Sequence, residues 1–146
     1  MVSTPWGKIG LAICYDINYP NLFRQYALAG ADAVIIPSCI RKQRSEKWNL
    51  LINARAYENQ LYMLSCNYIG LNPTVKNNED VMANDFSELG GMSSIIAPYG
   101  ETVIEGSNKK EDILIANIDL SESRIARTKY LSLKVEDKIL PIRRFS

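Results

Sequence analysis

The sequence contains no histidine among its 146 residues. This absence excludes Ser-His-Asp and Cys-His catalysis, and it removes the imidazole ligand on which many zinc sites depend. A cysteine nucleophile in this chain would therefore need a carboxylate, a lysine or local dipoles for its activation. Long apolar runs are also missing, which predicts that no segment spans a membrane.

An excess of charge of either sign is absent too. Lys and Arg together number 17 and Asp and Glu 16, so the net charge is +1. No overall field attracts nucleic acid or an anionic membrane surface, and we expect neither as a partner. Residues 1–5 carry no signal-peptide pattern, and three widely spaced cysteines do not form a disulfide framework. These features favour a cytoplasmic location.

Short apolar segments alternate with amphipathic ones in the first half of the chain, which predicts an α/β fold. Gly30 is expected to end the first helix, and Ser45 is expected to cap the second. The expected strands cover residues 8–14, 33–36 and 61–66, and the expected helices cover residues 21–29 and 45–59.

The second half of the chain has a different pattern, rich in turn residues. Residues 93–97 and 102–105 flank a Pro-Tyr-Gly-Glu turn and predict a β-hairpin. We also expect a polar loop at residues 72–84, a strand at residues 113–118, and a helix at residues 120–130 capped by Ser121.

Cys14, Cys39 and Cys66 fall at or just beyond the ends of the three expected strands. Ligands of α/β sheets bind beyond these carboxyl ends. The thiols could simply be buried, they could converge on a soft metal, or one of them could be a nucleophile. Their separations lack the Cys-x-x-Cys spacing of structural zinc sites, so we expect no metal and no cofactor.

The nucleophile hypothesis favours Cys14, because Tyr15 and Asp16 form an abrupt polar exit from an apolar strand. A nucleophile on such a strand-to-helix turn is open to substrate, and neighbouring backbone N–H groups can stabilise an oxyanion. Asp16 either orients this turn or faces the pocket. Trp48 belongs either to the core or to the pocket lining.

Several ordered motifs resemble the nitrilase superfamily of carbon-nitrogen hydrolases over about residues 7–133. The first is Gly10-Leu11-Ala12-Ile13-Cys14-Tyr15-Asp16, followed by Tyr19-Pro20. Later ones are Trp48 with Ala54-Arg55-Ala56-Tyr57-Glu58-Asn59-Gln60, then residues 66–70 and 91–101.

The resemblance implies an αββα sandwich, a Glu-Lys-Cys triad and assembly into homo-oligomers. Substrates would be small amides, N-carbamoyl amines or, in one branch, nitriles. Cys14 would attack the carbonyl carbon, and the backbone N–H of Tyr15 would help to stabilise the oxyanion.

Two departures from the family pattern affect this expectation. The family glutamate and lysine precede the cysteine, whereas only thirteen residues precede Cys14. Residues 1–146 are therefore expected to form a single partial domain that lacks the N-terminal half. Asn18 and Asn21 also replace an arginine and a glutamate that many members have. The alternative is a catalytically incomplete remnant or an interaction domain.

Charged residues outside the nucleophile turn carry weaker expectations. Arg55 and Glu58 lie three apart on one helix, which predicts a solvated ion pair, although the resemblance favours a structural or subunit-contact role. The basic run at residues 41–44 is expected to be a solvated loop, with a rim contact to an anionic substrate as the alternative.

Overall fold

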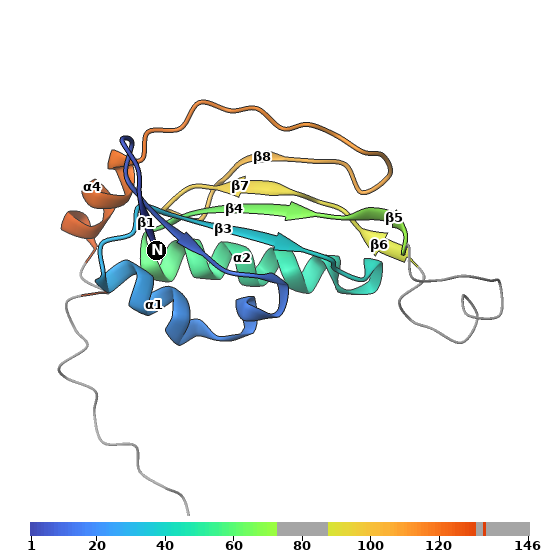
Figure 1. Ribbon diagram of the computed structural model, residues 1–146, viewed down its shortest axis with the longest axis horizontal. Coiled ribbons are helices and arrows are strands. Elements are labelled where there is room, and N and C mark those ends of the chain that lie inside the picture. Colours follow the sequence, from blue (N-terminus) through green and yellow to red (C-terminus); the bar gives the residue numbers. More distant parts are fainter. Residues whose placement is uncertain (73–87, 131–132, 134–146) are drawn as a thin grey trace, which may run out of the picture.

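The computed structural model of the protein describes residues 1–72, 88–130 and 133, which form an α/β fold around one mixed sheet (Figure 1). The expected loop at residues 72–84 lies, apart from Asn72, outside the described residues. No helix within the described ranges is long and apolar enough to cross a membrane. The elements are β1 (Val2–Ser3), β2 (Lys8–Leu11), η1 (Cys14–Asn18), α1 (Pro20–Leu28), β3 (Ala33–Ser38), η2 (Lys42–Arg44), α2 (Ser45–Asn59), β4 (Tyr62–Asn67), β5 (Ile69–Leu71), β6 (Glu88–Gly90), β7 (Ser94–Ile96), β8 (Thr102–Glu105) and α4 (Ser121–Lys129).

The main sheet has six strands in the order β1-β2-β3-β4-β7-β8. β2, β3 and β4 are parallel, because a helix connects each of these strands to the next. β1 and β7 pair antiparallel at the two sides of this parallel centre, and β8 pairs antiparallel with β7. The strand-helix alternation and the later hairpin are confirmed. β5 and β6 form a separate two-stranded sheet.

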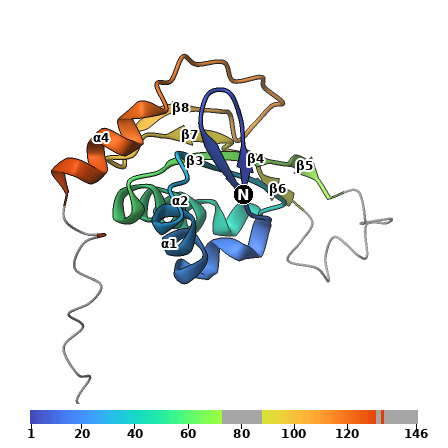
Figure 2. The same cartoon turned by 60° about the vertical axis from the view of Figure 1, so that its left-hand side comes forward.

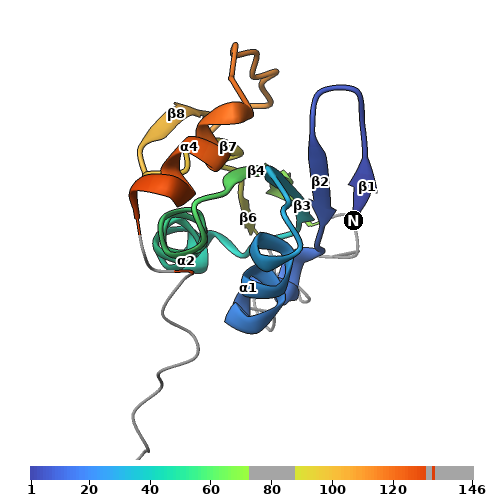
Figure 3. The ribbon, with the colours of Figure 1, turned by 90° about the vertical axis from the view of Figure 1, so that its left-hand side faces the viewer.

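α1 and α2 cover one face of the main sheet, as Figures 2 and 3 show from two sides. Phe23 and Ile52 from these helices and Ile36 and Met63 from the strands are fully buried in the core between the layers. Burying such side chains contributes roughly 1.5–3 kcal/mol each. This layer fixes the strands that lead to the site.

α1 ends where the sequence predicts, at Gly30. This residue has φ +82°, and its N–H donates to the carbonyl of Ala27 while the N–H of Ala31 donates to that of Tyr26. The pair of bonds is a Schellman motif, which needs a left-handed residue that glycine supplies without a steric penalty.

The predicted cap of α2 at Ser45 is wrong. The short helix η2 leads straight into α2, so Ser45 already has helical dihedrals (φ −58°, ψ −43°) and Arg44 is the N-cap residue. The Ser45 hydroxyl is buried and has no hydrogen-bond partner among the described residues. α2 ends at Asn59, as expected, because Gln60 adopts a left-handed conformation.

Two expectations for the last part of the chain are also corrected. Residues 113–118 form no strand, because no strand of the described chain pairs with them, and Ile113 and Ile115 stay exposed. Ser121 does not cap α4 with its side chain. The N-cap residue is Leu120, and the carboxylate of Asp119 just before it accepts a hydrogen bond from the N–H of Ser121 at 2.9 Å.

The sheet face away from α1 and α2 carries an apolar row. Paired positions on five neighbouring strands place these side chains side by side. Leu11 is 52% exposed and Ile35 is 40% exposed, which is unusual for large apolar residues in the centre of a sheet. The row consists of Leu11, Ile35, Leu64, Ile95 and Ile104.

Candidate active site

The site is built on the end of β2, which several contacts hold in place. A Cβ atom on Gly10 would lie 2.9 Å from the Val34 side chain and 3.0 Å from the Tyr26 ring, so only glycine allows this close packing. Tyr26 then donates its hydroxyl to the carbonyl of Leu11 at 2.6 Å. The N–H of Ala12 donates to Ile35 on β3. The segment before Cys14 is therefore tied to both the helix and the sheet.

Cys14 occupies a strained backbone position. Its φ of +44° places it in the left-handed region, which costs an ordinary L-residue roughly 1–2 kcal/mol. It begins η1, so the chain passes from strand to helix through this one residue. Strained residues of this kind cluster at functional sites, and the turn resembles the exposed elbow on which other hydrolases carry their nucleophile.

Asp16 closes the turn around Cys14. Its carboxylate accepts a hydrogen bond from the N–H of Ile13 at 2.8 Å, and its own N–H donates to the carbonyl of Ile13 at 2.9 Å. Its carbonyl accepts a third bond, from the N–H of Tyr19. These bonds fix the backbone on both sides of the nucleophile position.

Tyr15 lies in the first turn of η1, where backbone N–H groups have no acceptor within the helix. Its N–H is thus available to a negatively charged oxygen beside Cys14. The Tyr15 side chain is exposed and packs edge-to-face on Tyr19, with 6.0 Å between ring centroids. Asn18 donates its side-chain amide to the carbonyl of Tyr15 at 2.9 Å.

Cys14 opens into a cavity of about 490 Å³ between η1, the end of β3 and the start of α2. Its walls combine apolar side chains with cations, and no carboxylate of the described residues lines it. The lining residues are Cys14, Tyr15, Ile17, Asn18, Cys39, Ile40, Arg41, Arg44, Lys47, Trp48 and Leu51.

Trp48 satisfies both of its predicted roles, since it is only 3% exposed and still contributes to the cavity wall. Its indole N–H is buried and has no hydrogen-bond partner among the described residues. Cys39 lies in the same cavity. Partial burial raises the pKa of the Cys39 thiol, and the negative charge of the Cys14 thiolate raises it further.

Arg55 and Glu58 form the ion pair that their spacing predicts, but Arg55 is buried in it and not solvated. Its side chain is only 9% exposed, and it pairs with Glu58 at 2.9 Å. Its Nε also donates to the carbonyl of Ile17 inside η1 at 3.1 Å, and its guanidinium lies 5.9 Å from the centre of the Phe23 ring. Through Arg55, α2 therefore holds the backbone of the turn that carries Cys14.

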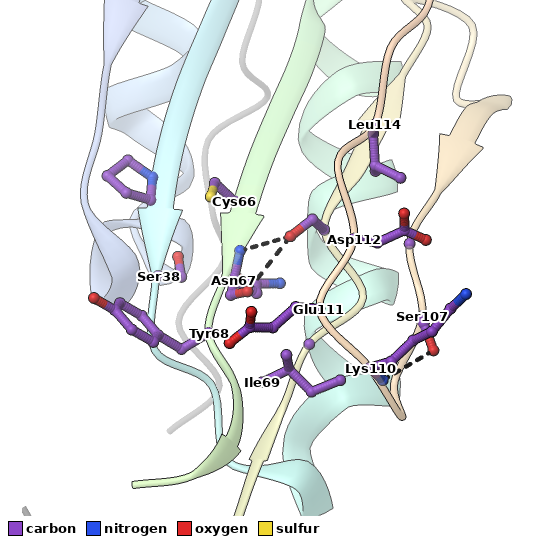
Figure 4. Close-up of a pocket in the computed structure, with 14 residues that line it drawn as sticks. Ser38, Cys66, Asn67, Tyr68, Ile69, Ser107, Lys110, Glu111, Asp112 and Leu114 are labelled. Atoms are coloured by element: carbon purple, nitrogen blue, oxygen red, sulfur yellow. Dashed lines mark hydrogen bonds between the residues drawn. The ribbon is translucent and has the colours of Figure 1, made fainter. Parts of the chain in front are cut away.

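Cys66 lies elsewhere, in a second cavity of about 330 Å³. Figure 4 shows this cavity between β4 and the chain segment that carries Lys110, Glu111 and Asp112. The three thiols thus do not share one site. In the described part of the chain, no group of three or more Cys, Asp or Glu side chains is arranged to hold a metal ion.

Comparisons with known proteins identify the family of the chain. The carbon-nitrogen hydrolase family model matches residues 1–128. The chain belongs to this family. It is 36% identical to the 2-oxoglutaramate amidase of Bacillus subtilis over 79% of the chain and 39% of that protein, and 33% identical to the human deaminated glutathione amidase over 86% of the chain and 35% of that protein.

A carbon-nitrogen hydrolase from Helicobacter pylori G27 has a similar structure, with a TM-score of 0.76 and 29% identity. The match covers 91% of this chain and 47% of that one. The present chain therefore spans less than half the length of these relatives. The α/β fold with a mixed sheet flanked by helices is the fold of the carbon-nitrogen hydrolases.

Cys14, Tyr15 and Trp48, which the sequence singled out, all line one cavity of this carbon-nitrogen hydrolase chain. Cys39 was considered only as one of three strand-end thiols and Lys47 was not expected there, whereas Arg44 lies on the rim, as the alternative for residues 41–44 allowed. The available signal was the strand-end rule, because β2 and β3 are parallel neighbours and the residues after both must meet at one edge.

Proposed function

We propose that this chain supplies the nucleophile of a hydrolase that cleaves the carbon-nitrogen bond of small amides. The observation that carries the proposal is the left-handed Cys14 at a strand-to-helix turn that opens into a cavity. A buried structural cysteine has no need of a strained backbone. Family membership gives the reaction class.

In the proposed reaction, the Cys14 sulfur attacks the amide carbon and forms a tetrahedral intermediate. The backbone N–H of Tyr15 stabilises the oxyanion. The intermediate expels the amine, which takes up the proton that a general base removed from the thiol. Water then hydrolyses the thioester and regenerates Cys14. Asp16 is the positioning residue that holds the turn.

The general base and a cationic oxyanion partner come, in this proposal, from chain that the relatives contain and these 146 residues do not. Two observations support it. The chain covers 39% of the Bacillus subtilis relative and 47% of the Helicobacter pylori chain. No carboxylate of the described residues lines the Cys14 cavity. The resemblance implies that these groups are a glutamate and a lysine.

The substrate would carry a carboxylate in addition to its amide. Arg44 and Lys47 line the Cys14 cavity and are exposed on its rim, where they can attract an anion. The names of two relatives, an amidase of 2-oxoglutaramate and one of deaminated glutathione, agree with such a substrate. An N-carbamoyl amino acid presents the same pair of groups and is the second choice.

The test joins this chain to the N-terminal half of the Helicobacter pylori relative and measures ammonia release from 2-oxoglutaramate. We expect turnover that Cys14→Ala abolishes. Cys66→Ala is the matched control, because Cys66 lines the other cavity, and it should keep the parent rate. Equal ammonia release by the parent and Cys14→Ala would refute the proposal.

The second candidate is a non-catalytic remnant or interaction domain. The observation in its favour is the cavity without a carboxylate among the described residues. Iodoacetamide alkylation near pH 7 separates the two candidates. A nucleophile position should react faster than Cys39 and Cys66, whereas a remnant should show three thiols of similar rate once their exposure is considered.

The apolar row on the open sheet face also supports association, either with the N-terminal half-domain of this proposal or between copies of the chain in a homo-oligomer. Large apolar side chains exposed at 40–52% are unfavourable in water. We expect the 146-residue chain alone to be associated in size-exclusion chromatography with light scattering. A monomer with a cooperative thermal transition would contradict this expectation.

A further inference from the structure

Two of the three thiols share one cavity. Cys14 follows the end of β2, Cys39 follows the end of β3, and both line the cavity described above. β2 and β3 are hydrogen-bonded parallel neighbours, and such strands lie about 4.8 Å apart. Cys14 and Cys39 themselves lie just beyond the strand ends, Cys14 three residues after Leu11 and Cys39 one residue after Ser38, so the strand order brings both thiols to the same edge of the sheet.

The two thiols also differ from Cys66 in their surroundings. The Cys14 charge acts on Cys39, where it adds to the effect of burial in raising the pKa of that thiol, so the two sulfur atoms are electrostatic neighbours. Cys14 is half-buried and Cys39 is exposed, and both can be reached from solvent. Cys66 lines the other cavity.

We propose that Cys14 and Cys39 form a reversible disulfide when the protein meets a hydroperoxide, with Cys39 as the resolving thiol. This modification site does not depend on the proposed hydrolase activity. It needs only two neighbouring thiols and an oxidant. Its consequence is a cysteine nucleophile that is blocked under oxidising conditions and restored by a thiol reductant.

The chemistry has two balanced steps. With hydrogen peroxide as the oxidant, the Cys14 thiolate attacks one oxygen, the O–O bond breaks, and Cys14 sulfenic acid and water form after proton uptake. Cys14 is oxidised by two electrons and the peroxide is reduced. The Cys39 thiolate then attacks the sulfenic sulfur, the S–O bond breaks, and hydroxide leaves and takes up the Cys39 proton to form a second water.

The disulfide would protect Cys14 from irreversible damage. A sulfenic acid without a resolving thiol is oxidised further to sulfinic acid, which ordinary thiols do not reduce. A neighbouring thiol intercepts it first. After oxidation and treatment with a thiol reductant, the parent should therefore recover the Cys14 thiol fully. The Cys39→Ser variant should not, because part of its Cys14 is oxidised beyond the sulfenic acid.

The test uses the whole chain at low micromolar concentration, treated with hydrogen peroxide and digested with trypsin without reduction. Lys and Arg positions place each cysteine on its own peptide, namely 9–24, 25–41 and 56–76. We expect a linked pair of peptides 9–24 and 25–41, two hydrogens lighter than their sum, which dithiothreitol separates. Cys66→Ser should give the same linked pair.

Cys39→Ser is the decisive variant, and Cys39→Ala repeats it should the serine variant fold poorly by circular dichroism. In both, the link should disappear and dimedone should trap sulfenic acid on Cys14. Equal dimedone trapping in the parent and Cys39→Ser, without the link, would overturn the proposal. So would a link to peptide 56–76, or a disulfide-joined dimer on a non-reducing gel in place of the internal link.

Discussion

Arg55 on α2 holds the carbonyl of Ile17 in the turn that carries Cys14, with 3.1 Å between Nε and the oxygen. The guanidinium is buried and neutralised by Glu58, and Arg55 thus holds the backbone of η1, the turn that begins at Cys14. This contact connects the long helix α2 to the turn at Cys14, although Arg55 lies 41 positions from Cys14 in the sequence.

Replacing Arg55 should loosen this turn. Arg55→Lys cannot bond Ile17 and Glu58 together, because lysine lacks the planar fork. We expect the free energy of unfolding to fall by about 2 kcal/mol in urea titrations. With the rate at Cys66 as the reference, iodoacetamide should alkylate Cys14 faster in Arg55→Lys than in the parent. The control is Arg124→Lys, since Arg124 is 61% exposed; an identical result for both variants would contradict the positioning role.

Arg44 and Lys47 should make the Cys14 cavity selective for anionic reagents. Iodoacetate and iodoacetamide differ by a carboxylate, so the ratio of their rates at one thiol reports the local charge. One cation at about 10 Å in water changes this ratio by about twofold. We expect the ratio of the iodoacetate rate to the iodoacetamide rate to be higher at Cys14 than at Cys66. In Arg44→Gln and in Lys47→Gln, this ratio at Cys14 should fall.

Salt provides the control for this charge effect. The difference between the two thiols should shrink as ionic strength rises to 1 M, where the screening length is about 3 Å. A ratio at Cys14 that does not respond to salt or to either substitution would show that the rim does not select anions.

Because the backbone is strained at Cys14, the glycine variant at this position should be more stable than the alanine variant, which reverses the usual order of stability. With φ at +44°, Cys14→Gly should be more stable than Cys14→Ala by about 1 kcal/mol, measured by urea denaturation. Glycine ordinarily lowers stability through its larger unfolded-state entropy. The matched pair is Cys39→Gly and Cys39→Ala, where we expect the ordinary order. The same order at both positions would argue against a strained turn.

Asp119 should make the stability of α4 depend on pH. Hydrogen bonds from Ser121 lower the pKa of the Asp119 carboxyl. A lowered pKa in the folded state means that the charged form stabilises the fold above the unfolded pKa, near 3.9, and that this contribution is lost as the pH falls through the folded value. Asp119→Ala should therefore have a lower urea midpoint than the parent at pH 7.

At pH 3 and below, the difference between Asp119→Ala and the parent should narrow. Asp112→Ala is the control, because the Asp112 carboxylate accepts a bond only from the adjacent N–H of Ile113 among the hydrogen bonds of the described residues. If the two variants changed the urea midpoint equally at both pH values, the Asp119 carboxylate would not stabilise the start of α4.

Sequence periodicity predicted the elements that bury an apolar face, and it failed where pairing depends on distant chain. β5 has three residues and β1 has two, and such short strands exist only because a partner lies beside them. Residues 113–118 are a short apolar run of the kind that favours a strand, but no described strand pairs with them. Pattern alone does not supply a hydrogen-bonding partner.

The strand-to-helix turn at Cys14 was predictable because its signal is local: a short apolar strand that leads into Cys14, Tyr15 and Asp16. The contents of the cavity were not, because Cys39 and Lys47 reach it through the order of the strands in the sheet. The role of Arg55 was hidden for the same reason. Its spacing to Glu58 predicts an ion pair, but not its burial or its bond to Ile17.

The pairing of Leu11 with Ile35 limits where the chain can accept insertions and deletions. Side chains alternate between the faces of a strand, so one residue inserted into β2 would turn its apolar set toward the wrong layer. An insertion after Leu11 would preserve the strand but displace Cys14 from the cavity edge. Insertions and deletions between Gly7 and Cys14 should therefore disrupt either the packing of β2 or the position of Cys14, whereas the exposed chain near Lys109 can vary in length.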